Sequence, residues 1–421
     1  MSIPSRVLVM GQGYVGLPLA AQAVEVGHLV TGYDVDEPRV KRLAAGESYV
    51  EDVPSDRLQA LLATGRLRVS SEVESCAAFD VAVITVPTPL RDGIPDLSFI
   101  EAATRILGRF VRPGATVILE STTYPGTTEE VVAGLLKDVS GLSPGEDFFL
   151  GYSPERIDPG NGTWRFDNTP KVVSGVDERS LAAVGAFYQT MCETTVPVSS
   201  PRVAELAKLL ENTFRHVNIA LVNEMAMFAR ELDINTWEAI DAASSKPFGY
   251  MRFTPGPGVG GHCLPIDPSY LSWRVQRALG RSFRFVELAN DINNHMPDYV
   301  LHRLMAGLND RGKAVKGARI LLLGLAYKKN TGDARESPAL RVCELLLQMG
   351  ADVRAVDPLV VEGRLDRRVS SAELTIEEVR AADAVVLLTD HDVFDLDLVT
   401  AHARYVLDCK NRVDGAAVER L

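Results

Sequence analysis

Short apolar runs alternate with amphipathic stretches along the first half of the chain. Runs of the length and composition typical of buried strands are Val7–Met10, His28–Tyr33, Val81–Val86 and Thr116–Leu119. The stretch Leu17–Val26 has the apolar spacing of a helix. Strands that alternate with helices predict a parallel sheet covered by helices on both faces. We therefore expect a doubly wound α/β domain over residues 1–198.

The pattern becomes helical in the middle of the chain. Ala204–Leu232 contains neither Gly nor Pro and repeats apolar residues at helical spacing. Thr236–Ala243 and Pro268–Leu279 are further helical stretches. These features predict a helical middle domain over residues 199–303, built around a long central helix of the kind that often forms dimers.

Strand and helix signals alternate again towards the C-terminus. The expected strands are Arg319–Leu323, Asp352–Val356, Ala384–Leu388 and Tyr405–Leu407, with a helix over Pro338–Met349. The predicted fold class is thus α/β, with two Rossmann-like doubly wound domains joined by a helical middle domain. The second doubly wound domain would occupy residues 304–421.

Composition narrows the class of protein. The 421 residues carry a net charge of −12, which argues against binding to nucleic acid or to an anionic membrane surface. The five cysteines are an odd number without paired spacing, and ligand spacings for a metal site are absent from the sequence. Neither a signal peptide nor a run of 18 apolar residues is evident, so we expect a soluble, cytoplasmic protein without a membrane partner.

A nucleotide fingerprint follows the first expected strand. Gly11, Gly13 and Gly16 form a GxGxxG pattern that opens a helix, and Asp34 ends the next strand. These glycines permit a tight turn, approach of a pyrophosphate and close helix packing, while the carboxylate favours NAD over NADP. Thr88 and Thr122 follow later strands, where they could face the cofactor or serve in turns.

One cysteine stands at the end of a glycine-rich run, Pro255-Gly-Pro-Gly-Val-Gly260-Gly-His-Cys263. Glycine lets a ligand come close to the backbone, and a thiol there can attack a carbonyl carbon. A nucleophilic thiol beside a hydride acceptor indicates oxidation past the aldehyde through a thioester. A buried, inert cysteine is the alternative that this motif alone leaves open.

The motifs together resemble a known family. They are GxGxxG, Ser121-Thr122, Ser153-Pro-Glu155, Lys208-Leu-Leu-Glu-Asn212, the Cys263-Leu-Pro-Ile-Asp267 segment, and Gly324-Leu-Ala-Tyr-Lys328 continuing to Arg335. In this order they resemble the UDP-glucose/GDP-mannose dehydrogenase family over nearly the whole chain. The phrases around Glu120–Gly126, Ser153–Gly160 and Lys246–Tyr250 look most like its bacterial UDP-N-acetyl-hexosamine 6-dehydrogenases, with UDP-N-acetylglucosamine first.

The resemblance implies an activity and partners. It implies four-electron oxidation of a sugar C6 alcohol to a carboxylate with two NAD per turnover, for a surface polysaccharide precursor. It also implies an N-terminal NAD-binding domain, a C-terminal domain that helps to hold UDP, and a homodimer formed through the central helix.

The resemblance also assigns roles to individual residues. The implied catalytic residues are Cys263, Lys208, Asn212, Asp267, Glu155 and Thr122. The implied cofactor-binding residues are Gly11, Gly13, Tyr14, Val15, Gly16, Asp34, Arg39, Thr88, Thr122 and Arg335. The implied substrate-binding residues are Glu155, Arg156, Lys208, Asn212, Arg252, Gly260, Lys328 and Lys410. Glu155 is the candidate general base for thioester hydrolysis, and a helix-cap carboxylate is its alternative role.

Two departures bear on the sugar. The UDP-glucose branch usually has lysine where this chain has Ile266 and Glu120, which favours an N-acetylated sugar. UDP-N-acetylgalactosamine, UDP-N-acetylmannosamine and UDP-glucose stay open as substrates. A two-electron hydroxyacid-type dehydrogenase and a non-catalytic NAD sensor are the alternatives from other classes.

Overall fold

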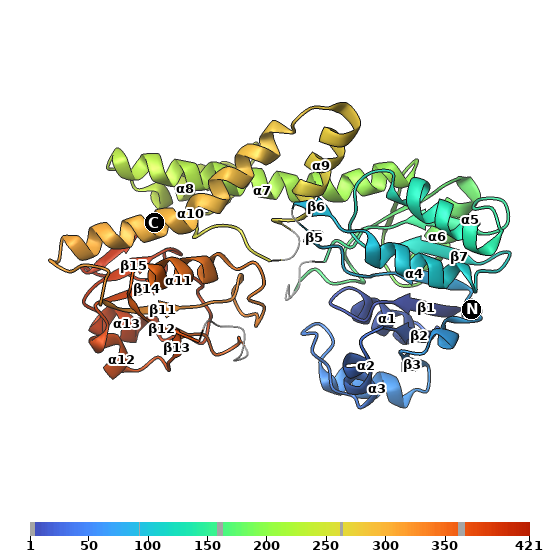
Figure 1. The fold of residues 1–421 in the computed structure, drawn as a ribbon, viewed down its shortest axis with the longest axis horizontal. Coiled ribbons are helices and arrows are strands. Elements are labelled where there is room, and N and C mark those ends of the chain that lie inside the picture. The colour runs from blue at the N-terminus through green and yellow to red at the C-terminus, as the bar shows by residue number, and fades with distance from the viewer. Residues whose placement is uncertain (1–4, 92, 158–162, 262–263, 361–366) are drawn as a thin grey trace. The chain divides into compact units, whose positions relative to one another are not determined.

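The computed structural model describes all residues except 1–4, 92, 158–162, 262–263 and 361–366 (Figure 1). The chain divides into two compact units. The N-terminal unit comprises Met1–Glu211 with Trp273–Leu279, and the C-terminal unit comprises Asn212–Ser272 with Gly280–Leu421. The division into three domains at 198 and 303 stays a prediction.

The N-terminal unit is built on one twisted sheet with the strand order β10-β9-β8-β7-β4-β1-β2-β3. All neighbours are parallel except β8 and β9. Its strands are β1 (Arg6–Met10), β2 (Leu29–Tyr33), β3 (Leu67–Ser70), β4 (Val81–Ile84), β7 (Thr116–Leu119), β8 (Phe149–Tyr152), β9 (Lys171–Gly175) and β10 (Thr195–Pro197). A separate hairpin pairs β5 (Leu90–Arg91) with β6 (Ile94–Pro95).

Helices cover both faces of this sheet. They are α1 (Gly16–Glu25), α2 (Glu37–Ala44), α3 (Ser55–Ala63), α4 (Ser98–Gly108), α5 (Ala133–Ser140) and α6 (Glu178–Tyr188), with a 3₁₀ turn η1 (Val73–Cys76) and a π-helical turn η2 (Thr127–Val132). Alternate side chains of β1 point to opposite cores. Val7 and Val9 pack with α1, α3 and α6, whereas Leu8 and Met10 pack with α4 and α5. The near-continuous apolar strands of the sequence reflect this burial on both faces.

The C-terminal unit contains a second sheet, fully parallel, with the order β13-β12-β11-β14-β15-β16. Its strands are β11 (Arg319–Leu323), β12 (Asp352–Val356), β13 (Ser370–Ser371), β14 (Ala384–Leu387), β15 (Val406–Asp408) and β16 (Val418–Arg420). Helix α11 (Pro338–Gln348) and helix α10 (Arg284–Asn309) cover one face. Helices α12 (Ile376–Ala381) and α13 (Leu396–His402) cover the other. The predicted α/β fold with two doubly wound sheets is confirmed.

The middle of the chain is helical, as the sequence predicts. Helix α7 (Pro201–Glu231) is the long central helix, and the boundary between the two units falls within it. Helices α8 (Thr236–Ser244) and α9 (Asp267–Leu279) match the two shorter predicted stretches. The sequence pattern does not predict α10, which contains the buried Pro297 at a position where proline usually ends a helix.

Candidate functional site

The predicted residues of the N-terminal unit lie along one edge of its sheet. Five neighbouring parallel strands, β2, β1, β4, β7 and β8, end side by side, with Met10 in register with Tyr33 and with Ile84. The residues that come after these strands are, in the same order, Asp34, the Gly11–Gly16 turn, Thr88, Thr122 and Glu155. The strand order reverses at β1, where ligands of doubly wound sheets bind.

Each of the three fingerprint positions favours glycine for a different structural reason. Gly11 has a φ of 95°, and a Cβ there would lie 2.7 Å from the Thr85 carbonyl oxygen. A Cβ on Gly16 would lie 1.8 Å from the Gly11 carbonyl oxygen, so glycine is required where α1 begins. A Cβ on Gly13 would meet no described atom within 4 Å. The space above Gly13 is therefore open to a pyrophosphate, as a dinucleotide site requires.

Asp34 is fixed at the carboxyl end of β2. Its Oδ2 accepts hydrogen bonds from the Gln12 N–H at 2.8 Å and from Arg39 Nη1 at 3.0 Å. Its Oδ1 accepts from the Asp36 N–H at 3.0 Å. These contacts hold the carboxylate beside the glycine turn, where it can receive the hydroxyls of an adenosine ribose. Tyr14 and Val15 lie in the same turn, with Tyr14 42 % exposed.

The two threonines occupy strand ends, as expected from their positions. Thr88 is buried after β4, and Thr122 is half-buried after β7. The loop that contains Thr122 is held by Glu205 of α7, which accepts hydrogen bonds from the N–H groups of Gly126 and Thr128. Burial raises the pKa of Glu205, although these donors oppose the rise.

Glu155 belongs to a buried charge cluster that the sequence pattern does not predict. Lys171, the first residue of β9, pairs with Glu120 at the end of β7 and with Glu155 at 3.1 Å. Glu155 also caps the turn after it, because its Oε1 accepts from the N–H groups of Arg156 and Ile157. Arg156 in turn forms an ion pair with Glu211 at 2.7 Å. The only sequence signal for Lys171 is a charge at the start of an otherwise apolar strand.

In the C-terminal unit the glycine run before Cys263 rests on the loop after β11. A Cβ on Gly260 would lie 2.8 Å from the Cβ of Tyr327, and a Cβ on Gly261 would lie 2.7 Å from the Tyr327 ring. The Gly261 N–H donates to the Arg335 carbonyl oxygen at 3.3 Å. The structure thus joins the cysteine motif to the Gly324-Leu-Ala-Tyr motif. Cys263 itself lies outside the described residues.

Lys410 approaches the same glycine run from the carboxyl end of β15. A Cβ on Gly256 would lie 3.3 Å from Lys410 Nζ, and the Gly256 N–H donates to Asn223 Oδ1 at 2.9 Å. Burial lowers the pKa of Lys410, while the carboxylate of Asp390 acts in the opposite direction. The predicted substrate-binding lysine therefore lies within one unit beside the predicted cysteine loop.

Two implied catalytic side chains are in direct contact. Asn212 Nδ2 of α7 donates to Asp267 Oδ2 at the start of α9, and both residues are buried. Lys208 is also buried, one helical turn before Asn212 on α7. The four-residue spacing places Lys208 and Asn212 on the same face of the helix.

The remaining implied residues have local partners. Arg335 pairs with Asp333 at 2.6 Å, and Lys328 comes after β11 in the same loop. Arg252 pairs with the exposed Asp241 of α8. The structure of the C-terminal unit therefore places Lys328, Arg335 and Lys410 near the carboxyl edge of its sheet, and joins Arg252 to α8.

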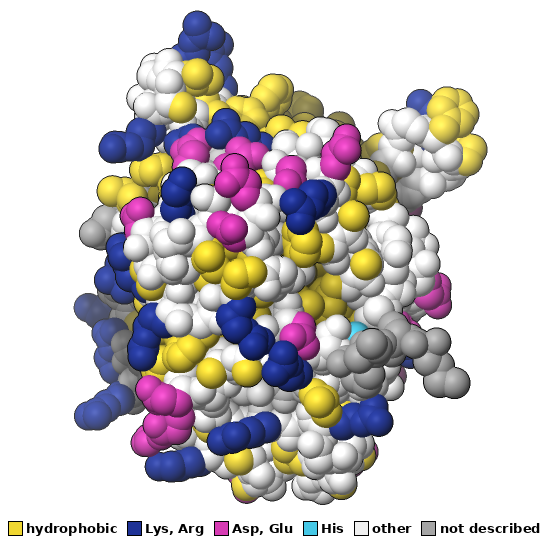
Figure 2. Space-filling model, turned by 90° about the vertical axis from the view of Figure 1, so that its right-hand side faces the viewer, with side chains coloured by type: hydrophobic (Ala, Val, Ile, Leu, Met, Phe, Trp, Pro, Cys, Tyr) yellow, Lys and Arg dark blue, Asp and Glu magenta, His cyan; other side chains and the backbone are white. Residues whose placement is uncertain are grey.

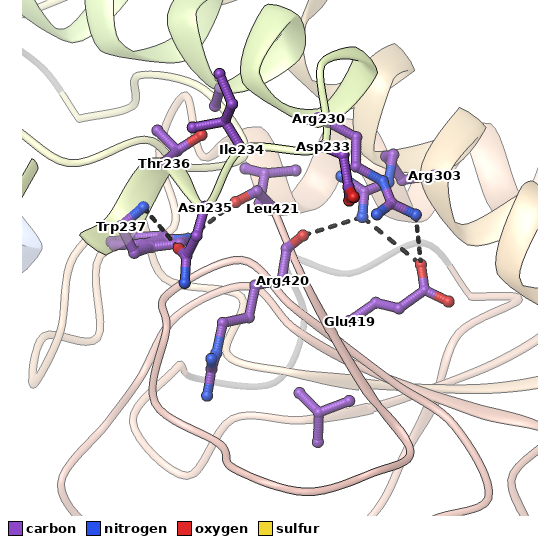
Figure 3. Close-up of a pocket in the computed structure, with 12 residues that line it drawn as sticks. Arg230, Asp233, Ile234, Asn235, Thr236, Trp237, Arg303, Glu419, Arg420 and Leu421 are labelled. Atoms are coloured by element: carbon purple, nitrogen blue, oxygen red, sulfur yellow. Dashed lines mark hydrogen bonds and ion pairs between the residues drawn. The ribbon is translucent and has the colours of Figure 1, made fainter. Parts of the chain in front are cut away.

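A hollow of about 330 Å³ lies elsewhere in the C-terminal unit, where the last residues of the chain meet the turn after α7 (Figure 3). Arg303 pairs there with Glu419 at 3.6 Å, and Glu419 also pairs with Arg230 and Arg311. Trp237 Nε1 donates to the Leu421 carbonyl oxygen at 2.8 Å. The residues that line the hollow include none of the predicted site residues, so we do not assign the active site to it.

Several other cysteines are poor nucleophiles. Burial raises the pKa of Cys76, Cys192 and Cys409 to about 12. Their thiols are therefore held in the protonated form at neutral pH.

Family models match the chain along most of its length. The NAD-binding domain of the UDP-glucose/GDP-mannose dehydrogenase family matches residues 5–192, its central domain residues 202–295, and its UDP-binding domain residues 321–415. The chain belongs to the UDP-glucose/GDP-mannose dehydrogenase family. It is an NAD-dependent oxidoreductase of the nucleotide-sugar dehydrogenase type, and the glycine turn and Asp34 lie within its matched NAD-binding domain.

Relatives in this family differ in the sugar they are named for. The UDP-N-acetyl-D-mannosamine dehydrogenase of Pyrococcus horikoshii is 38 % identical over 390 residues, covering 92 % of this chain and 90 % of its own. The UDP-N-acetyl-D-glucosamine 6-dehydrogenase of Pseudomonas aeruginosa is 35 % identical, covering 92 % and 91 %. A solved structure of the P. horikoshii enzyme superposes with a TM-score of 0.90 at 34 % identity, covering 99 % of this chain and 98 % of that one.

The described residues also bear on a basic surface, a membrane-spanning helix and a metal site. On the face drawn in Figure 2, acidic and basic side chains are interspersed, and the described residues form no continuous basic field there. Within the described part of the chain, every helix is too short or too polar to cross a bilayer. The described His, Cys, Asp and Glu side chains also include no group of three that could hold a metal ion.

Proposed function

We propose that this chain oxidises the C6 hydroxyl of a UDP-N-acetyl-hexosamine to a carboxylate. The observation that carries the proposal is the contact between the cysteine motif and the C-terminal loop motif, through Gly260, Gly261 and Tyr327. This contact brings the segment before the thiol to the edge of the UDP-binding domain. NAD supplies the hydride acceptor and is used twice for each sugar.

The chain's own residues then divide the chemistry. Lys208 and Asn212 stabilise the oxygen of C6 as its proton passes to a bound water, which Thr122 and Asp267 assist, and Asp267 also orients the Asn212 amide. The Cys263 thiolate attacks the aldehyde carbon, and the resulting thiohemiacetal is oxidised to a thioester. Water cleaves the thioester with Glu155 as the base. Lys328 and Lys410 bind the diphosphate, with Arg252 and Arg156 as further substrate contacts.

UDP-N-acetylglucosamine is the first candidate substrate, because the phrases around Glu120–Gly126 and Lys246–Tyr250 look most like enzymes for that sugar. UDP-N-acetylmannosamine is the second candidate, because relatives named for it include one that is 38 % identical. We expect two NADH per sugar and the highest kcat/KM for UDP-N-acetylglucosamine in a panel that includes its 2- and 4-epimers and UDP-glucose. A higher kcat/KM for UDP-glucose would contradict the choice of an N-acetylated sugar.

Cysteine dependence tests the reaction class. We expect Cys263→Ala to abolish net oxidation, measured as NADH release and as carboxylate product. A two-electron hydroxyacid-type dehydrogenase would keep its turnover in this variant, and a sensor would release no NADH even as the unaltered protein. The panel and this variant together separate the three classes.

We also propose a homodimer formed through α7. Apolar side chains recur on this helix at spacings of three, four or seven residues and are between 44 % and 63 % exposed: Leu206, Leu210, Phe214, Leu221, Met225 and Phe228. A stripe of this length is typical of a protein interface, and a second copy would supply an equivalent stripe.

The dimer is tested by a charge on this stripe. We expect Leu210→Arg combined with Leu221→Arg to give monomers in light scattering, because two buried charges cost more than the contact can supply. Leu288→Arg is the matched control, since Leu288 is 55 % exposed on α10 and not on α7. A dimer that persists in the α7 variant but dissociates in the control would contradict the proposal.

A further inference from the structure

A lysine is buried between two glutamates at the carboxyl edge of the N-terminal sheet. The side chains of Lys171, Glu120 and Glu155 are 4 %, 0 % and 12 % exposed. Lys171 Nζ contacts Oε1 of Glu120 and lies 3.1 Å from Oε2 of Glu155. Burying a charge costs free energy unless the charge is paired. The burial of three charges together at this edge therefore requires an explanation.

The outer groups of the cluster are fixed from both sides. The Tyr188 hydroxyl of α6 donates to Oε2 of Glu120 at 2.5 Å, so both oxygens of this carboxylate have donors. Oε1 of Glu155 accepts from the N–H groups of Arg156 and Ile157 at 2.7 and 2.6 Å. Lys171 thus bridges the inner carboxylate, Glu120, and the outer carboxylate, Glu155, and the two carboxyl groups also interact directly with each other.

The charges of the cluster do not cancel. Two carboxylates and one ammonium leave one net negative charge in a buried place, so uptake of one proton makes the cluster neutral. Burial and Glu155 raise the pKa of Glu120, although Lys171 opposes the rise. Burial would also raise the pKa of Glu155, but Lys171, the hydrogen bond with Glu120 and the Ile157 N–H outweigh it and lower that pKa.

This arrangement resolves a difficulty for Glu155. A carboxylate with a lowered pKa is a weak base when considered alone. Interacting groups, however, take up protons as a unit, with a pKa that belongs to the whole unit. The proton that Glu155 receives need not stay there, because Lys171 contacts a carboxylate of higher pKa on its other side.

We propose that Glu155, Lys171 and Glu120 form one proton-accepting unit that serves thioester hydrolysis. The proposal rests on the proposed function, in which water cleaves a thioester at Cys263. Water's oxygen bonds to the carbonyl carbon, its proton passes to Glu155, and the carbon–sulfur bond breaks to release the Cys263 thiolate. Lys171 then gives a proton to Glu120 and takes the proton from Glu155. Glu155 is the catalytic residue of this unit, and Lys171 and Glu120 act through it.

Among the described residues, Tyr188 and Cys192 are further titratable groups that face the cluster, and burial raises the pKa of both. The rings of Phe166 and Tyr188 lie 5.0 and 5.1 Å from Lys171 Nζ. Arg156, beyond Glu155, is already paired with Glu211.

Glu120→Gln tests the unit. This variant keeps an acceptor for Tyr188 and leaves Lys171 on Glu155, but it removes the inner proton acceptor. With NAD and the best UDP-sugar of the panel, stopped-flow absorbance should show a burst of two NADH per site at the unaltered rate. The steady state should then be slower by about tenfold or more. Intact-protein mass spectrometry should show the sugar attached to Cys263.

A matched control removes a different bridging carboxylate. Glu378→Gln takes away a carboxylate that lies 2.8 Å from Arg319 and 2.5 Å from Arg354 in the C-terminal unit. This variant should turn over like the unaltered protein, without a burst. Steady-state turnover of Glu120→Gln within about twofold of the unaltered protein, with no covalent adduct, would overturn the proposal. Failure of the proposed function has another signature, since the unaltered protein would then fail to give two NADH per sugar.

Tyr188→Phe provides a second measurement that does not depend on removing a charge. The Tyr188 hydroxyl stabilises the ionised form of Glu120, so its loss should raise the pKa of Glu120. The base form of the unit would then be present only at higher pH. In single-turnover experiments, the decay rate of the covalent adduct should fall as the pH is lowered. This fall, the acid limb of the pH profile, should occur at higher pH than in the unaltered protein. An unmoved limb would count against Glu120 as the inner acceptor.

Discussion

The sheets of the N-terminal and C-terminal units begin with the same arrangement of strand and turn. Gly11 comes after β1 with a φ of 95°, and Gly324 comes after β11 with a φ of 83°. The Gly11 N–H donates to the Tyr33 carbonyl at 2.8 Å, and the Gly324 N–H donates to the Val356 carbonyl at 2.9 Å. In both units the next strand is followed directly by an aspartate, Asp34 after β2 and Asp357 after β12.

The two units differ in the helix that comes after the turn. In the N-terminal unit α1 starts at Gly16, and among the described side chains none caps its first turn at Val15. In the C-terminal unit α11 starts only at Pro338, and Ser337 caps it by accepting from the Ala339 N–H. Proline has no N–H, so the first turn of α11 offers fewer donors than that of α1.

The two aspartates also have different partners. Oδ2 of Asp357 accepts from the N–H groups of Leu325 and Ala326 and contacts His391 Nε2 at 3.1 Å. Asp357 therefore engages two N–H groups of its own turn in hydrogen bonds. Asp34 accepts only one N–H group of its glycine turn, that of Gln12, among the described contacts. We therefore expect this strand and turn to bind a dinucleotide only where the N–H groups of the turn are available to phosphate.

The largest expected effect comes from the glycine that closes the N-terminal turn. Gly16→Ala places a Cβ 1.8 Å from a backbone oxygen, so we expect a loss of about 3 kcal/mol in the free energy of unfolding. Gly13→Ala meets no described atom within 4 Å and should leave the thermal midpoint unchanged while weakening NAD binding by tenfold or more. Calorimetry of unfolding and of NAD binding measures both. Equal losses of stability in the two variants would contradict the different roles of these glycines.

Substitution of the two aspartates should affect different properties, namely stability for Asp357 and NAD binding for Asp34. Burial raises the pKa of Asp357, but hydrogen bonds from His391, Leu325 and Ala326 outweigh it and lower the pKa to about 2. Because the folded pKa is the lower one, this stabilisation is present above about pH 4 and is lost as the pH falls towards 2. We expect Asp357→Asn to cost about 2 kcal/mol at pH 7 and less at pH 3.

Asp34→Asn is the matched variant in the N-terminal unit. It should change the unfolding free energy by less than about 1 kcal/mol but weaken NAD binding, because Asn cannot accept both ribose hydroxyls. Urea unfolding at pH 7 and pH 3, together with NAD titration, distinguishes the two. Weaker NAD binding in Asp357→Asn than in Asp34→Asn would break the comparison.

The sequence predicts the strands β1, β4, β7, β11 and β12 well, because strands buried on both faces are continuous apolar runs. It predicts less between residues 145 and 200, where β9 begins with Lys171 and β10 is short and partly exposed. Helix α10 escapes prediction because Pro297 lies within it, packed in the core of the C-terminal unit. Local pattern therefore fails where tertiary packing overrides it.

The residues of the candidate site likewise include some that the sequence reveals and others that only the fold brings together. Residues in motifs, such as Gly11, Asp34, Asn212 and Asp267, can be named from the sequence because spacing carries the signal. Lys171 cannot be named from the sequence, because its partner Glu120 is 51 residues away. Only the pairing of β7, β8 and β9 brings the two residues together. The contact of Gly260 with Tyr327 is equally invisible along the chain.

The smallest expected effect concerns Arg39, the cation beside Asp34. Arg39 Nη1 lies 3.0 Å from Asp34 Oδ2, but the Arg39 side chain is 35 % exposed. The ion pair should therefore contribute less than about 1 kcal/mol to stability. Arg39→Ala should therefore leave unfolding nearly unchanged. Its effect should appear in the choice of cofactor once the carboxylate is gone, because an arginine near this position can bind a 2′-phosphate.

We expect Asp34→Asn to raise the ratio of kcat/KM for NADP over NAD by about tenfold, and Asp34→Asn with Arg39→Ala to lose most of that gain. Steady-state kinetics with both cofactors measures the ratio. An equal ratio in the single and double variants would mean that Arg39 only holds Asp34 in place. In the C-terminal unit the described partners of Asp357 are instead His391 and N–H groups of its own turn, so the same substitution there should act on stability.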